Sequence, residues 1–222
     1  MPASPYAKNV KRVSSGDVYM RIKTEKQKGE TCNPTSMSMI LDYYGIYVSS
    51  ARLRRDSEKN KKREDRKAYM FSSYLMEQLK KYKMQMLYIP MMKDAEKEVF
   101  ESVKRAIDCG IPLQWLVDLL QAPDYDIKKK QKEYIIEEND GDGAHVRVFH
   151  GYHLNMKTKK IDSFIFSDSW GVKHRKKNIK IADVAKMTNG FYLIVPERIN
   201  RKIINYIYEP IADKLKEKEI VL

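Results

Sequence analysis

A cysteine, a histidine and an aspartate in this chain have local settings that suit nucleophilic catalysis. Cys32 stands in Gly-Glu-Thr-Cys-Asn-Pro-Thr-Ser, directly before a segment with helical periodicity. The free N–H groups and the dipole of a helix N-terminus favour negative charge, so this position suits a thiolate nucleophile. A cysteine at a helix start is more often structural when nothing else accompanies it. Cys32 therefore needs a base.

His145 is the histidine best placed to be that base. The chain has four histidines, and His145 opens a β-rich run directly after the turn-forming Gly-Asp-Gly-Ala. Strand alternation puts His145 and His153 on one face, but roughly 26 Å apart, which is too far for one metal ion, and His150 points away. We therefore expect a thiol–imidazole pair, with neither a metal nor an organic cofactor.

Asp168, within Ser-Asp-Ser-Trp-Gly, is the expected third member. The run that ends there follows the His145 run across a short turn at 156–160, so the two runs are predicted to form an antiparallel hairpin. A register centred near residue 157 puts Asp168 opposite residue 146, beside His145. A carboxylate there can accept the other imidazole N–H and fix the tautomer. Asp168 by itself would be interpreted as a turn aspartate, but the three residues together predict a triad.

Thiolate attack on a carbonyl also needs hydrogen-bond donors for the developing oxyanion. The backbone N–H of Cys32 is in position for this task, and Gln27, five residues earlier, offers a side-chain amide. The second cysteine, Cys109, follows a helical run and precedes Gly110, which is typical of a buried thiol at a helix end. Two cysteines exclude a disulfide framework and leave a single bridge open.

The elements that must position these residues come in the order helices, then strands. Helical periodicity covers residues 33–44, 69–82 and 94–109, the last with Asp94 as N-cap. Strand-like runs follow at 112–120, 145–154, 164–169 and 191–195. This order predicts an α+β domain, with a helical part that carries the nucleophile packed on an antiparallel sheet that carries His145 and Asp168.

The remaining segments are predicted to connect or extend this domain. Residues 50–67 form a highly charged connection, and 121–142 form a surface loop that borders His145 and could shape a substrate cleft. A short helix is predicted at 181–187 and a terminal helix at 197–218, interrupted by Pro210.

Composition fits one globular domain with a basic surface. The 222 residues are 42% hydrophobic, and 43 Lys and Arg against 30 Asp and Glu give a net charge of +13. The basic runs contain acids and match no nucleic-acid motif, so a solvated surface is favoured and nucleic acid is the minor alternative. No apolar run reaches 18 residues, so no transmembrane segment is expected. The first residues lack the features of a signal peptide and are equally compatible with a domain excised from a longer protein, so the compartment stays open.

The motifs around the three residues resemble those of papain-like cysteine peptidases. Within that clan they are similar to the bacteriocin-processing peptidases that cut double-glycine leaders. The segments that carry the resemblance are Thr-Cys-Asn-Pro-Thr-Ser-Met-Ser-Met-Ile-Leu-Asp-Tyr-Tyr-Gly (31–45), Ile-Pro-Leu-Gln-Trp (111–115), Ala-His-Val-Arg-Val-Phe-His-Gly-Tyr (144–152), Ser-Asp-Ser-Trp-Gly (167–171) and Thr-Asn-Gly-Phe-Tyr-Leu-Ile-Val-Pro (188–196). The resemblance implies a papain-like domain over residues 25–196, after an irregular segment at 1–24 and before a helical extension at 197–222.

The same resemblance implies a triad of Cys32, His145 and Asp168 and an oxyanion glutamine. Two departures from the family pattern stand out: Asn33 replaces the usual glycine, and Lys26 occupies the usual place of the glutamine. Either a one-residue insertion makes Gln27 the equivalent, or the donor is missing and turnover is weakened. The chain has no Gly-x-x-x-x-Gly-Lys-Ser/Thr motif, so coupling to an ATPase is not supported.

The predicted function is that of a cysteine peptidase that acts on a peptide or protein through an acyl-enzyme. The same triad could serve deamidation or acyl transfer, because an acyl-enzyme also forms from a glutamine side chain or is resolved by an amine. A third alternative is a papain-like binding domain that has lost turnover, which the two departures favour.

Overall fold

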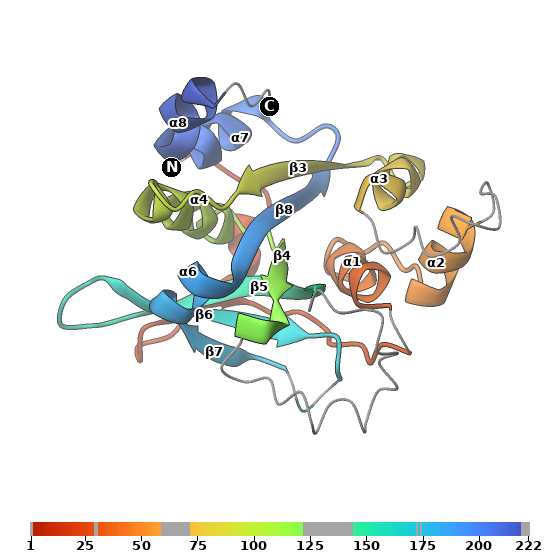
Figure 1. Cartoon of the computed structure of the whole chain (residues 1–222), viewed down its shortest axis with the longest axis horizontal. Helices are drawn as coiled ribbons and strands as arrows, with labels where there is room; N and C mark the ends of the chain where they lie inside the picture. Colours follow the sequence, from red (N-terminus) through yellow and green to blue (C-terminus); the bar gives the residue numbers. More distant parts are fainter. Residues whose placement is uncertain are drawn as a thin grey trace.

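The helices of the chain lie on both sides of a curved sheet in the computed structural model, which describes residues 2–28, 31–58, 72–121, 144–171, 173 and 175–218 (Figure 1). The helices are α1 (Cys32–Tyr43), α2 (Ser50–Glu58), α3 (Ser72–Lys81), α4 (Glu96–Asp108), α6 (Ile181–Met187), α7 (Arg201–Tyr208) and α8 (Ala212–Glu217). Among them, none is both long and apolar enough to cross a membrane. Of the loop predicted at 121–142, all but Gln121 lies outside the described residues.

The strands are β1 (Val10–Arg12), β2 (Asp17–Met20), β3 (Met84–Pro90), β4 (Leu113–Asp118), β5 (Ala144–Leu154), β6 (Ile161–Asp168), β7 (Lys177–Lys180) and β8 (Thr188–Pro196). Within the described residues they form one eight-stranded sheet in the order β1-β2-β5-β4-β8-β3, and β6 joins β5 to β7. Every pairing between these strands is antiparallel. The predicted α+β architecture is therefore confirmed.

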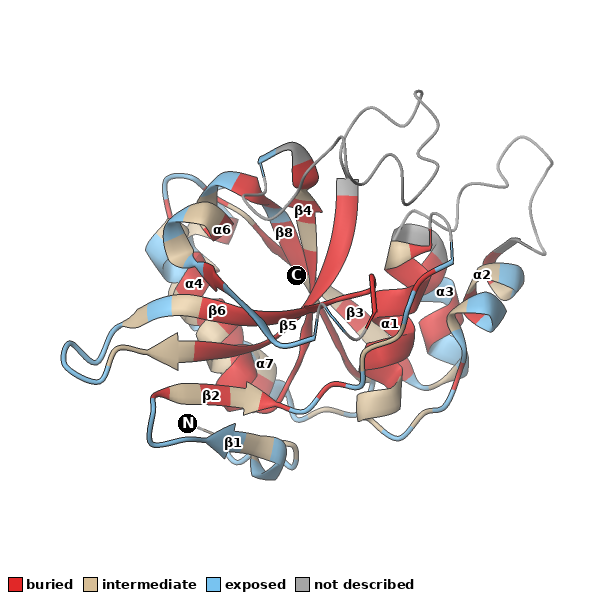
Figure 2. Cartoon of the chain, turned by 90° about the horizontal axis from the view of Figure 1, so that it is seen from below, coloured by how far each residue is buried: buried red, intermediate tan, exposed pale blue. Residues whose placement is uncertain are grey.

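β5 is the strand on which the sheet is organised. β4 pairs with its first half, up to Phe149, and β2 takes over the same edge at Gly151–His153. β6 runs along β5 from Arg147 to Leu154 and therefore occupies the opposite edge. Figure 2 shows that β5 and the neighbouring parts of β6 are almost entirely buried.

Two hydrophobic cores form on the two faces of the sheet, because successive side chains of a strand point to opposite faces. On β5, Phe149 belongs to the first core, with α4 and α7, whereas Val148 belongs to the second, with α1 and α3. The helical periodicity of α1 is confirmed here, since Met37, Ile40 and Leu41 are all fully buried in the second core. The two cores fix α1 and β5 relative to one another.

The N-terminal segment is more regular than predicted. Instead of an irregular stretch over 1–24, β1 and β2 form a hairpin with Val10 opposite Met20. The reason is that β5 extends beyond the end of β4, so its free edge at 151–153 can pair with β2. Val18 and Met20 are buried as a result.

Local structure differs from the sequence analysis at three other places. The charged connection begins with a helix, α2, because Leu53 is buried while the charged residues remain at its surface; residues 59–67 lie outside the described part. The strand β3 was not predicted, although Met84 and Met86 alternate with less buried residues as in a half-buried strand. Asp94 does not cap α4, whose N-cap is Ala95, and instead pairs with Lys218 at 3.0 Å.

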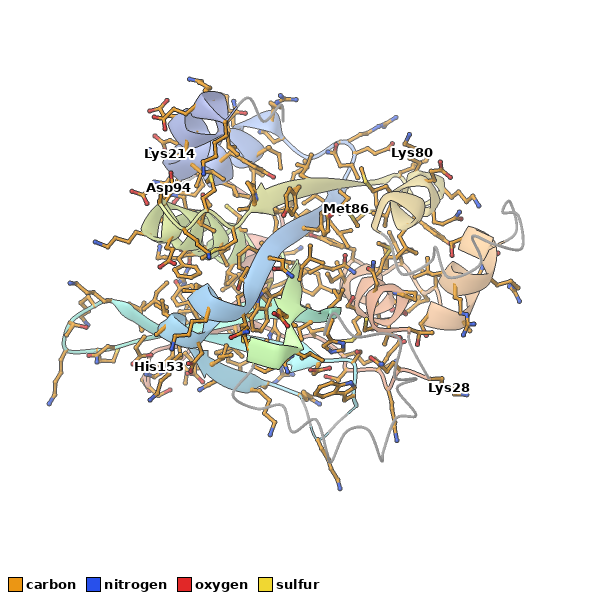
Figure 3. The ribbon with its side chains drawn as sticks, viewed as in Figure 1. Lys28, Lys80, Met86, Asp94, His153 and Lys214 are labelled. Atoms are coloured by element: carbon orange, nitrogen blue, oxygen red, sulfur yellow. The ribbon has the colours of Figure 1, made fainter. Side chains whose placement is uncertain are left out.

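The C-terminal helices close the first core. The predicted terminal helix starts later, at Arg201, and breaks as predicted at Pro210, in a short 3-10 turn between α7 and α8. Ile203 and Ile207 of α7 are fully buried in the core that includes α4. Figure 3 shows Lys214 of α8 beside Asp94, at the start of α4. The extension therefore packs on the domain, while the predicted boundary at residue 196 stays a prediction.

Candidate active site

Cys32 is the first residue of α1, which begins one residue earlier than the sequence predicts. Its side chain is partly exposed, whereas Cys109 is fully buried, and both thiols are free. The first turn of α1 holds no acidic residue, so no carboxylate there opposes a thiolate. Thr31, the N-cap, accepts the Lys28 backbone N–H on its Oγ1 at 3.2 Å and thereby holds the chain that leads into the helix.

His145 lies on β5 between Cys32 and Asp168. Its Nε2–H donates to Asp168 Oδ1 at 2.9 Å, which leaves Nδ1 as the ring nitrogen available to the thiol. Burial lowers the pKa of His145, but the charge and hydrogen bond of Asp168, with a smaller contribution from a hydrogen bond to Cys32, outweigh it and raise the pKa to about 9. Such an imidazole holds its proton at neutral pH and suits an ion pair with a thiolate.

Asp168 is one residue out of the predicted register. The sequence predicts residue 146 opposite it, whereas the structure pairs it with Arg147. The two irregularities of β5, after Phe149 and after His153, cancel one another, so the difference is already present beside the turn, where Leu154 pairs with Ile161. The shift matters because the side-chain period is two: opposite Arg147, Asp168 shares a face with His145 as well.

Three donors converge on the Asp168 carboxylate, which is 1% exposed. Besides His145, Arg147 donates from Nε to Oδ2 at 2.8 Å, and the Trp170 backbone N–H donates to Oδ1 at 3.2 Å. Burial raises the pKa of Asp168, but His145 first and Arg147 second overcome it and lower the pKa to about 2. The Trp170 ring stacks on His145 with centroids 4.8 Å apart, so the imidazole is held from its face as well as its edge.

Gln27 is turned inward at the same place, and Lys26 is not. Gln27 is buried, whereas Lys26 is exposed and forms a backbone bridge with Trp170. The Gln27 backbone N–H donates to the Ser169 carbonyl at 2.6 Å, and its side-chain Oε1 accepts a hydrogen bond from the Ser169 hydroxyl. This contact uses the carbonyl end of the amide, so the Nε2 donor end is directed away from Ser169. Gln27 therefore fits an oxyanion donor better than Lys26 does.

Sequence analysis did not identify Gln114, which ties β4 to the start of the nucleophile helix. Its fully buried Nε2 donates to Asn33 Oδ1 at 3.0 Å, to the Asn33 carbonyl at 3.2 Å and to Ser36 Oγ at 2.8 Å. Asn33, which departs from the family pattern, thus has a structural partner. A glutamine in the middle of an apolar strand was the available signal, because a buried amide needs partners.

We expect Gln114→Leu to lower the free energy of unfolding by about 1–3 kcal/mol, because it leaves the buried Asn33 side chain without this donor. Chemical denaturation followed by circular dichroism measures the loss. The matched control is Gln85→Leu on β3, since Gln85 is only half-buried and bonds the Pro196 carbonyl at 3.5 Å. Equal stabilities of the two variants would contradict the assignment.

The other described histidines have structural roles. His150 is buried, its Nδ1–H donates to the Met20 carbonyl at 2.8 Å, and its Nε2 lies 3.0 Å from Ser167 Oγ. Burial lowers the pKa of His150 to about 4, so it is neutral at pH 7. His153 pairs with Asp17 at 2.8 Å on the hairpin edge. In the described part of the chain, no three His, Cys, Asp or Glu side chains form a cluster that could hold a metal ion.

Comparison with known proteins places this arrangement in a family. The model of the Peptidase_C39 like family matches residues 18–195. A crystal structure of a double-glycine motif protease from an AMS/PCAT transporter, in complex with its leader peptide, matches at 13% identity and a TM-score of 0.50, over 83% of this chain and 96% of that one. A C39-like peptidase from Bacillus anthracis matches at 18% identity and a TM-score of 0.50, over 81% of this chain and 97% of that one.

These two structures confirm the papain-like fold, in which a helix and a curved antiparallel sheet face one another. No curated protein matches the sequence. The family match covers α1, β5 and the segment 167–171. The resemblance seen in the motifs therefore extends over the whole of the predicted domain except its last residue, and it also includes all of β2 but Asp17. The chain belongs to the C39-like peptidase family.

Proposed function

We propose that this protein is a cysteine peptidase that cleaves peptide bonds through Cys32, His145 and Asp168. The observation that carries the proposal is the hydrogen-bonded series from Asp168 Oδ1 through His145 to Cys32, at the N-terminus of α1. A base oriented by a buried carboxylate and turned toward a thiol is the arrangement that nucleophilic catalysis requires. The family match supports the same reaction class.

In the first half of the reaction, the Cys32 thiolate attacks the peptide carbonyl carbon. The developing oxyanion is held by the Cys32 backbone N–H and the Gln27 side-chain amide. Protonated His145 then donates its Nδ1 proton to the leaving amine as the C–N bond breaks. The products are a thioester on Cys32, a free amine and a neutral His145.

In the second half, neutral His145 takes a proton from a water molecule that attacks the thioester carbonyl. The C–S bond breaks, the acid product leaves, and the Cys32 thiolate and the His145 imidazolium are restored. Asp168 accepts from Nε2 throughout and keeps Nδ1 directed at the thiol. We propose a peptide or protein as the substrate, in line with the leader peptide bound by the double-glycine motif protease.

A peptide-library screen tests the reaction class. We expect the wild-type protein to produce new peptide termini, and Cys32→Ala to lower the rate by about 10³-fold or more, because the nucleophile is lost. Mass spectrometry identifies the cleaved peptides, and an enzymatic assay for free ammonia is run on the same samples. Release of ammonia without new peptide termini would show that the reaction is deamidation or acyl transfer and not peptide cleavage. The absence of both, with a Cys32 that is alkylated no faster than an ordinary thiol, would favour the binding domain.

A further inference from the structure

A fully buried arginine stands behind the candidate triad. Arg147 is 0% exposed, and its guanidinium carbon lies 4.7 Å from the ring centroid of Phe166, 5.5 Å from that of Trp115 and 5.7 Å from that of Trp170. Aromatic faces stabilise a buried guanidinium through their negative potential. Its Nε–H is directed at Asp168 Oδ2, the oxygen that His145 does not use.

Asp168 needs a cation at every stage of the reaction, and His145 supplies one for only part of it. A buried carboxylate without a counter-charge is strongly destabilised. In the proposed reaction His145 is charged before amine release and neutral afterwards. An arginine side chain in a protein does not lose its proton, so the charge of such a residue does not change through a catalytic cycle.

We propose that Arg147 is a positioning residue, which keeps Asp168 anionic and oriented while His145 is neutral and so allows His145 to give up its proton. This inference rests on the proposed function, because it concerns the same site. Without the arginine charge, loss of the His145 proton would leave Asp168 as an uncompensated buried anion. His145 would then hold its proton more tightly and would be a weaker acid towards the leaving amine.

The groups that face His145 are few among the described residues. Cys32 approaches from α1 and Asp168 from β6. Arg147 lies on β5, the strand of His145 itself, and acts through the Asp168 carboxylate. Asp118 on β4 follows Val117, the residue opposite His145, and by strand alternation faces the other side of the sheet. The charge next to His145 is therefore set mainly by Asp168 and its arginine.

Two variants separate the charge of Arg147 from its hydrogen bond. Arg147→Gln retains an N–H donor and removes the charge, whereas Arg147→Lys retains the charge. Long-range ¹H–¹⁵N NMR follows the titration of His145, which is identified by its absence from His145→Ala. We expect Arg147→Gln to raise the midpoint of the His145 titration by about one pH unit. We expect Arg147→Lys to leave this midpoint within a few tenths of a pH unit of the wild-type value.

Cys32 alkylation at pH 6 distinguishes failure of this inference from failure of the proposed function. If wild-type alkylation does not depend on His145, the proposed function fails. If wild-type alkylation does depend on His145, but His145 titrates with the same midpoint in Arg147→Gln as in the wild type, Arg147 only supports the fold. In that case the inference alone is overturned. If Arg147→Gln does not fold, Arg147→Lys decides: an unchanged midpoint upholds the role of the charge, and a raised one overturns it.

Discussion

In a Cys109→Ser background, iodoacetamide should alkylate Cys32 rapidly at pH 6, and His145→Ala should slow this reaction by roughly 10²-fold. The estimate follows because an ordinary thiol, with a pKa of about 8.5, is only about 0.3% ionised at pH 6, and because a more acidic thiolate is somewhat less nucleophilic. In the proposed site, the Asp168-supported imidazolium of His145 stabilises the Cys32 thiolate. Mass spectrometry of the alkylated protein, sampled over time from pH 5 to pH 9, gives the rates.

His153→Ala is the matched control for this experiment, because His153 also pairs with an aspartate but lies on the hairpin edge of β5. Its alkylation profile should superimpose on that of the wild type. Cys32→Ser, with Cys109 retained, should react slowly, since burial raises the pKa of Cys109 to about 11. If the wild-type alkylation rate is low, increases only near pH 8.5 and does not change when His145 is replaced, Cys32 is an ordinary thiol.

The second large effect concerns stability. Asp168→Ala should lower the free energy of unfolding by about 3–5 kcal/mol, because it removes the carboxylate that pairs with Arg147, and both side chains are at most 1% exposed. Asp168→Asn should lose less, since an amide oxygen still accepts one of the hydrogen bonds. Urea denaturation measures both, with Asp162→Ala on the same strand as the exposed control, for which we expect a change within 0.5 kcal/mol.

The difference in unfolding free energy between wild type and Asp168→Ala should depend on pH, and the two pKa shifts give the direction. The pKa of Asp168 is lowered to about 2, so its contribution to stability is present above the unfolded value near 3.9 and is lost as the pH falls towards 2. The pKa of His145 is raised to about 9, so its contribution is complete below about 6.5 and is lost as the pH rises through 9. The gap between wild type and Asp168→Ala should therefore be widest from pH 4 to pH 6.5. A gap that does not vary with pH would contradict the coupling.

The nucleophile helix and the histidine strand could be predicted from the sequence because their signals are local. The spacing of Met37, Ile40 and Leu41 indicates one buried helix face, and Pro34 marks its first turn. α2 was missed because a charged helix that buries little more than Leu53 differs hardly at all from a charged loop in composition. β3 was missed because short apolar runs do not distinguish strands from helices.

The partners of Asp168 could not be predicted in full, because they depend on register and on burial. Counting outward from a turn centred near residue 157 gave residue 146, whereas the pairing of Leu154 with Ile161 beside the turn sets the register that brings Arg147 opposite Asp168. An arginine in a strand is usually exposed, so its residue type did not indicate that Arg147 is buried. Gln114 was missed for the same reason. The roles proposed for Cys32, His145, Asp168 and Gln27 stay predictions.

The lysines on two outer strands of the sheet offer a second explanation for the basic composition. β1 and β7 end two of the three branches that leave β5, and both are short, with exposed lysines at residues 11, 177 and 180. A strand edge offers unpaired N–H and C=O groups to any other strand, and lysines hinder the approach of a second copy. We therefore expect these lysines to oppose pairing between the edges of two copies, a role that requires no anionic partner.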